Sequence, residues 1–240
     1  MELGLYTFGE RTLDPDLGRP PTAEERLRRL LEEAELAEGV GLGVYAVGEH
    51  HREEYVVSAP AVVLAAIAAC ARRRRRSSAA VAPSSDAPVR VFQRFATRDL
   101  RSGGRAELWV GRGSFVESFP LFGYELRDYE ALFEEKLALL LKIREEEKVF
   151  WPGGRFTKPI PGLGVYPRPK QDPLPLWVAA GGSPESAVRA GRLGLPLVLG
   201  IIAGYLVGTP SFVGVIPVGS TTDLDLERRA LRYESVTVTD

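Results

Sequence analysis

Short apolar runs alternate along the chain with longer segments whose apolar residues recur at helical spacing. The runs end at glycine or polar residues and predict strands, whereas spacings of three and four residues predict helices. The expected strands cover residues 2–8, 44–48, 77–82, 106–110, 176–180 and 196–202, and residues 212–218 are compatible with a seventh. The expected helices begin near Thr22, Pro60, Pro88, Asp128 and Ser183, with a closing helix at 224–233. This alternation predicts a parallel sheet, either a closed barrel or an open doubly wound sheet.

Helix starts and breaks support this division. Thr22 and Glu25 have the spacing of a capping box, in which each side chain satisfies a free amide at a helix start. Residues 151–175 are rich in proline and glycine and are expected to form an excursion between a helix and the fifth strand. No repeat and no linker divides the chain. We therefore expect a single domain covering residues 1–240.

Composition adds constraints on location and partners. The 31 basic and 32 acidic residues leave a net charge of −1, so the basic surplus of a nucleic-acid-binding protein is missing. Cys70 is the single cysteine, which excludes an internal disulfide, and the amino terminus lacks a signal-peptide pattern. Residues 193–222 contain no charge, but their prolines and glycines favour buried strands over a membrane helix. We expect a cytoplasmic protein that binds neither membranes nor nucleic acid.

Both histidines of the chain stand side by side at the end of the second expected strand, as His50 and His51. In parallel β/α folds, sites form at the carboxyl ends of the strands. Neighbouring residues on an extended segment point to opposite sides, and no spaced third ligand accompanies the pair, so a zinc site is not expected. We expect one histidine to face a cavity as a proton donor, acceptor or substrate-orienting group, and the other to be packed or hydrogen-bonded.

Two further strand ends have residues suited to an anion. Gly182 and Ser183 precede an expected helix, where free amides and the hydroxyls of Ser183 and Ser186 could bind phosphate. An ordinary capped helix explains the same residues equally well. Arg112 lies between two glycines at the end of the fourth strand and could bind a phosphate or carboxylate, or form a structural ion pair.

Several other motifs are excluded by their context. The glycines at 39, 41 and 43 follow a helix and precede a strand, the reverse of a dinucleotide fingerprint, so they are interpreted as a helix stop. The arginine run at 72–76 enters a strand without other basic clusters, which argues against a nucleic-acid patch. No G-x-S-x-G elbow is present for a serine hydrolase.

Together these strand ends resemble the bacterial luciferase-like flavin-dependent monooxygenases. The resembling segments cover most of residues 1–204 in family order and are "VGEHH", "SSAAVAPSSDAPVRVFQRFATRDLRSGGRAELWVGRG", "FPLFG" and "PLWVAAGGSPESAVRAGRLGLPLVLGII". The resemblance implies a TIM-type (β/α) barrel that binds reduced FMN at its carboxyl-terminal rim and uses molecular oxygen to oxidise a substrate. Some relatives use a deazaflavin instead.

The resemblance also implies roles for individual residues. His50 matches the family's catalytic-site histidine, and Arg112 matches the arginine near the flavin phosphate. Gly182, Ser183 and Ser186 match the phosphate-binding turn, which favours phosphate over simple capping there. Ser78 and Ala79 match the strand end where the backbone lies against the flavin ring. Gly111 stands where luciferase has a reactive cysteine, so that role is missing.

The carboxyl end departs from the family pattern. Residues 205–240 are divergent or truncated, with only a short connection after Ile202 and no eighth β/α unit, so we expect a shortened and incomplete barrel. The function implied is a monooxygenase that receives reduced FMN from a separate flavin reductase. The alternatives are a deazaflavin-dependent oxidoreductase, a non-catalytic flavin-binding protein and an interaction module derived from the barrel. Because the family pairs through early helices and residues 60–71 are unusually apolar, a homodimer is expected.

Overall fold

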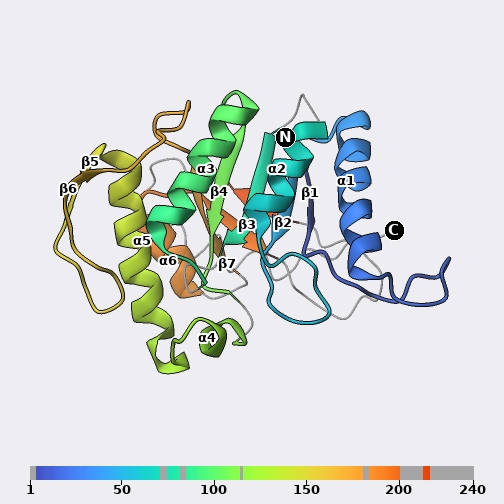
Figure 1. The fold of residues 1–240 in the computed structure, drawn as a ribbon, viewed down its shortest axis with the longest axis horizontal. Coiled ribbons are helices and arrows are strands. Elements are labelled where there is room, and N and C mark those ends of the chain that lie inside the picture. Colours follow the sequence, from blue (N-terminus) through green and yellow to red (C-terminus); the bar gives the residue numbers. More distant parts are fainter. Residues whose placement is uncertain are drawn as a thin grey trace.

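A curled β-sheet with helices around it forms the body of the protein (Figure 1). The computed structural model describes residues 4–70, 75–81, 85–113, 116–180, 184–200 and 213–216. The sheet contains β1 (Gly4–Thr7), β2 (Val44–Gly48), β3 (Arg75–Val81), β4 (Ala106–Val110), β7 (Leu176–Ala180), β8 (Leu197–Gly200) and β9 (Val213–Ile216). The helices are α1 (Ala23–Gly39), α2 (Pro60–Cys70), α3 (Pro88–Ser102), α4 (Ser118–Leu121), α5 (Tyr129–Glu145) and α6 (Pro184–Arg192).

The order of the sheet is β1-β2-β3-β4-β7-β8-β9, and β1 to β8 pair in parallel throughout. The expectation of a parallel sheet built from β/α units is therefore confirmed for the six strands up to residue 200. The strand expected at 212–218 exists as β9, but it pairs antiparallel to β8 and so does not continue the parallel series. Only residues 201–212 join the two strands, close to the minimum for a parallel crossover, whereas an antiparallel return needs few residues.

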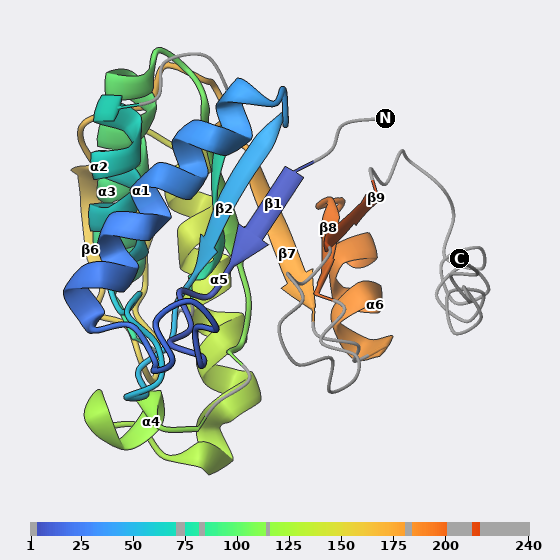
Figure 2. The ribbon, with the colours of Figure 1, turned by 90° about the vertical axis from the view of Figure 1, so that its right-hand side faces the viewer.

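The sheet curls so that strands from its two ends share one interior. Tyr6 on β1, Ala46 on β2, Trp109 on β4 and Val198 on β8 form a single buried cluster. Figure 2 shows α1, α2 and α3 on the outside of β1 to β3 and α6 outside β7 and β8, with β9 next to β8. A shared interior with helices outside is the arrangement of a (β/α) barrel, as expected, and not of an open doubly wound sheet.

The outward faces of the strands pack against the helices in two apolar clusters. On one side, Tyr45 and Val47 of β2 meet Leu30 of α1 and Leu64 of α2. On the other, residues of β4 and β7 meet the apolar faces of α3 and α5, including Phe92 and Phe95. Phe92 is 1% exposed. β2, β4 and β7 are thus packed on two opposite faces, which explains why these strands are mostly apolar.

Sequence patterns at the helix ends are confirmed in detail. The hydroxyl of Thr22 accepts a hydrogen bond from the Glu25 amide at 3.2 Å, and the Glu25 carboxylate accepts from the Thr22 amide at 2.7 Å. α1 ends at Gly39, and Gly41, with a φ of 90°, follows the C-cap Val40, which agrees with the interpretation of these glycines as a helix stop. No helix among the described residues is long and apolar enough to cross a membrane. The closing helix expected at 224–233 lies outside the described residues.

A hairpin formed by β5 (Lys148–Trp151) and β6 (Ile160–Gly164) was not predicted. Its loop is fixed by Glu135 of α5, whose carboxylate accepts hydrogen bonds from the amides of Arg155 and Phe156, each at 2.9 Å. Proline and glycine in this segment indicated an irregular excursion. The contact with Glu135 is tertiary and leaves no local signal, which is why the pairing was missed.

Candidate functional site

His50 follows β2 and lies between two aromatic rings. Its ring centroid is 4.4 Å from that of Phe8 and 4.5 Å from that of Tyr55. The residue is 7% exposed, and its amide donates a hydrogen bond to the Val57 carbonyl at 2.9 Å. Burial, followed by the nearby His51, lowers the pKa of His50 to about 4. At neutral pH His50 is therefore an uncharged imidazole, able both to donate and to accept a hydrogen bond.

Glycine at position 48 allows this aromatic arrangement. A Cβ atom there would lie 2.4 Å from Cδ1 of Phe8 and 2.7 Å from the Tyr6 hydroxyl. These distances are shorter than any van der Waals contact, so a larger residue would push Phe8 away from His50. β2 thus ends in glycine at the point where the side chains of Tyr6 in β1 and of Phe8 directly after it pack against the strand.

His51 points to a different part of the molecule. Its Nε2 lies 2.8 Å from Oε1 of Glu49, and its ring meets Phe122 edge-on at 5.2 Å. Glu49 and His51 line a cavity of about 420 Å³ between the starts of α2 and α3. The two histidines therefore face different surroundings, His50 beside the interior aromatic residues of the sheet and His51 in the helical layer.

Arg112 and Ser186, predicted separately, are in contact. Nη2 of Arg112 donates a hydrogen bond to Oγ of Ser186 at 3.2 Å, and Ser186 is 4% exposed in the first turn of α6. Arg112 also forms an ion pair with Glu130 and lies 5.1 Å from the ring centre of Tyr129. The Tyr129 hydroxyl donates to the Gly113 carbonyl at 2.6 Å, which holds the loop after β4 in place. The fold thus joins the ends of β4 and β7 through these side chains.

A second arginine belongs to this cluster and was missed in the sequence. Nη2 of Arg189 donates to Oε2 of Glu130 at 2.8 Å and to Oε1 of Glu134 at 3.2 Å. Its Nη1 is buried and makes no hydrogen bond within the described part of the chain. Ser186 and Arg189 are three residues apart on α6 and so share a helix face, a spacing that could have identified Arg189. No local signal links Glu130 of α5 to either arginine.

The remaining predicted residues are placed only in part. Ser78 and Ala79 lie in β3 opposite Val47 and Gly48 of β2, next to the strand that leads into His50. The pairing of β3 with β4 is irregular between Ser78 and Val81, at the carboxyl end of the strand. Gly182 and Ser183 lie outside the described residues, directly before α6.

Two tryptophans add hydrogen-bond donors to the interior. Trp109 and Trp177 are paired across β4 and β7. Within the described ranges, the indole Nε1 of each is buried and makes no hydrogen bond. Buried N–H groups normally find an acceptor, so this pair suits an oxygen atom of a bound molecule. The apolar strand pattern gave no hint of these donors.

The site therefore combines two chemistries at one rim. His50, Arg112 and α6 all follow the carboxyl ends of parallel strands, which share one edge of the sheet. Two guanidinium groups and a buried hydroxyl suit a phosphate, and an uncharged imidazole suits proton transfer or substrate orientation. Among the described residues, no three histidine, cysteine or acidic side chains lie close enough together to hold a metal ion.

Comparison with known proteins identifies relatives. Residues 1–205 match the profile of a family described as luciferase-like monooxygenase. The N-acetyl-S-alkylcysteine monooxygenase of Bacillus subtilis is 30% identical over 185 residues, covering 76% of this chain and 53% of that protein. The F420-dependent glucose-6-phosphate dehydrogenase of Amycolatopsis mediterranei is 33% identical over 110 residues, covering 45% of this chain and 32% of that protein.

Solved structures share the fold. The monooxygenase RslO1 from Streptomyces bottropensis superposes with a TM-score of 0.70 at 29% identity, covering 82% of this chain and 59% of that one. The oxygenating constituent of 3,6-diketocamphane monooxygenase from Pseudomonas putida, solved with FMN, gives a TM-score of 0.69 at 19% identity and covers 82% and 56%. The chain thus spans between about one third and three fifths of the length of these four proteins.

Proposed function

Because this chain belongs to the luciferase-like monooxygenase family, we propose that it is a flavin-dependent oxidoreductase of the monooxygenase type. It would use reduced FMN, supplied by a separate flavin reductase, and molecular oxygen to oxidise a small organic substrate. The main support is the contact between Arg112 and Ser186, which joins two strand ends beside the first turn of α6. A phosphate at this position would meet two arginines and a hydroxyl, so the residues present fit the phosphate of FMN.

Each predicted residue has a role in this proposal. Arg112, Ser186, Gly182 and Ser183 bind the phosphate, and Arg189 joins them. The backbone at Ser78 and Ala79 supports the flavin ring. Reduced flavin, when bound, supplies the electrons for the reduction of oxygen.

His50 is the catalytic residue in this proposal. Its uncharged imidazole donates a hydrogen bond to, or accepts one from, the reacting oxygen or the substrate. The rings of Phe8 and Tyr55 hold the imidazole in position and limit the access of water to it. His51, paired with Glu49, remains structural.

A deazaflavin-dependent oxidoreductase is the second candidate. The relative from Amycolatopsis is named as F420-dependent, and both kinds of cofactor contain a phosphate that an arginine cluster can bind. Oxygen uptake separates the two functions, because the first candidate consumes oxygen with its substrate and the second transfers a hydride without oxygen.

The test is a titration of the protein with FMN, riboflavin and a deazaflavin, in which binding is monitored by absorption and fluorescence. Oxygen uptake is then measured with a flavin reductase, NADH and a panel of small substrates. We expect the protein to bind FMN with higher affinity than riboflavin, and we expect oxygen uptake only when a substrate is present. Binding of FMN without turnover would favour a non-catalytic flavin-binding protein, and no binding of any flavin would overturn the proposal.

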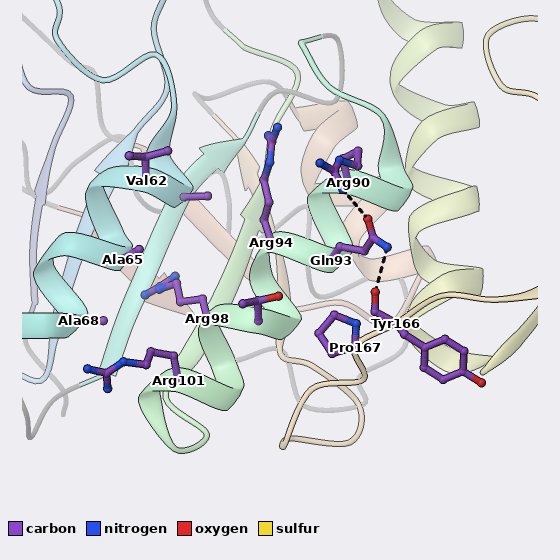
Figure 3. A pocket seen from close by; sticks show the side chains of 12 residues that line it. Val62, Ala65, Ala68, Arg90, Gln93, Arg94, Arg98, Arg101, Tyr166 and Pro167 are labelled. Carbon is purple, nitrogen blue, oxygen red and sulfur yellow. Dashed lines mark hydrogen bonds between the residues drawn. The ribbon is translucent and has the colours of Figure 1, made fainter.

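We also propose that the protein is a cytoplasmic homodimer paired through α2. This helix has no charged residue, and Val62 on its outer side is 69% exposed. α2 and α3 line a groove of about 570 Å³. Figure 3 shows Val62, Ala65 and Ala68 of α2 on one side of it and arginines of α3 on the other. Two-fold pairing would place α2 against α2 of the partner and remove this apolar surface from water.

A further inference from the structure

We propose that Glu130 competes with the flavin phosphate for Arg112 and Arg189, and so keeps the affinity for phosphorylated flavins low. This inference rests on the proposed function, since it requires a flavin phosphate at the arginine cluster. It assigns to α5 a residue that tunes cofactor exchange, beyond the strand ends that bind the cofactor.

Glu130 uses its two carboxylate oxygens on two different arginines. Oε1 pairs with Nη1 of Arg112, and Oε2 accepts from Nη2 of Arg189 at 2.8 Å. Ser186 binds Arg112 from the side of α6. A phosphate that contacts Ser186 and both guanidinium groups needs the same donors that Glu130 holds, so the two anions compete directly.

The carboxylate is the partner free to move. The side chain of Glu130 is 51% exposed, whereas those of Arg112 and Arg189 are 17% and 15% exposed. The two guanidinium groups also lie over aromatic rings, 5.1 Å from Tyr129 and 5.4 Å from Phe133. A phosphate would therefore displace Glu130 into water and leave the arginines in place.

The local charge explains why this competition matters. Arg112 and Arg189 carry two positive charges, and Glu130 and Glu134 carry two negative charges, so the cluster is close to neutral. A phosphate monoester brings about −1.5 to −2 at neutral pH and meets repulsion from a displaced glutamate nearby. An enzyme that receives reduced flavin from another protein and returns it oxidised must release it in each turnover. A carboxylate that returns to the arginines favours that release.

The test compares Glu130→Gln with the parent protein and with Glu145→Gln. Glu145 is on the same helix, 65% exposed, and the substitution changes the net charge equally. Glu145 is fifteen positions after Glu130, which places it about 22 Å farther along the helix. Dissociation constants for FMN, riboflavin and inorganic phosphate are measured by fluorescence and calorimetry, and circular dichroism with thermal unfolding checks the fold of each variant.

We expect Glu130→Gln to bind FMN about tenfold more tightly than the parent, the order for one unit charge acting on a half-exposed site. Riboflavin should bind equally to all three proteins, and Glu145→Gln should match the parent. If the parent binds FMN and the folded Glu130→Gln variant binds it no more tightly, the inference is overturned and the proposed function stays intact. If neither the parent nor Glu130→Gln binds FMN, the proposed function fails, and this inference with it.

Discussion

Replacing Arg112 by alanine should weaken the binding of FMN far more than it weakens the fold. The substitution removes the donor that contacts Ser186 and one of the two positive charges of the cluster. A hydrogen bond to a charged group contributes about 1.5–3 kcal/mol, so the dissociation constant for FMN should rise about 10- to 150-fold. The dissociation constant for riboflavin, which lacks the phosphate, should hardly change.

The expected loss of stability is small because the ion pair is partly open to water. Glu130 is 51% exposed, and such pairs contribute about 0–1 kcal/mol. The contact with Tyr129 adds about 0.5–1 kcal/mol. Arg127→Ala is a matched control, since this side chain is 73% exposed and pairs with Glu125. Titration by flavin fluorescence and thermal unfolding measure both quantities. Equal losses for FMN and riboflavin would show that Arg112 does not recognise the phosphate.

Three further predictions concern His50 and α2. His50→Ala should bind FMN nearly as well as the parent but oxidise substrate about a hundredfold more slowly, measured as oxygen uptake at saturating flavin; loss of binding with retained turnover would contradict the role. Because the folded pKa of His50 is lowered from 6.5 to about 4, the unfolded state binds the extra proton, and stability should fall as the pH drops through this window. In urea unfolding, the free energy of unfolding should fall between about pH 7 and about pH 5 in both proteins, and the fall should be about 1–2 kcal/mol smaller for His50→Gln than for the parent. An equal fall in both proteins would refute the assignment. Val62→Arg should convert the dimer into a monomer in light scattering, whereas a monomeric parent would refute the pairing.

Much of the barrel could be predicted because its local signals agree. Strands buried on both faces, such as β2 and β7, are mostly apolar, and the capping box at Thr22 and Glu25 marks the start of α1. The direction of β9 could not be predicted, because the same apolar residues suit a strand in either direction. Pairing direction depends on the path of the connecting chain and on the neighbouring strand.

The candidate site shows the same limit. Residues at strand ends could be placed on one rim, and the contact between Arg112 and Ser186 agrees with that placement. The residues that surround them come from elsewhere in the fold. Phe8 reaches His50 from the residue directly after β1, and Glu130 reaches the arginines from α5. Such contacts depend on how helices and strands pack, and no spacing along the chain encodes them.

The aromatic rings on either side of His50 have a consequence for the entropy of the reaction step. A side chain held at centroid distances of 4.4 and 4.5 Å from two rings has few rotamers left to lose. The ordering of the imidazole is then complete when the protein folds, and the step in which it meets the substrate needs little further reorganisation. Folding free energy, distributed over the whole barrel, thereby sets the orientation of one ring before any substrate arrives.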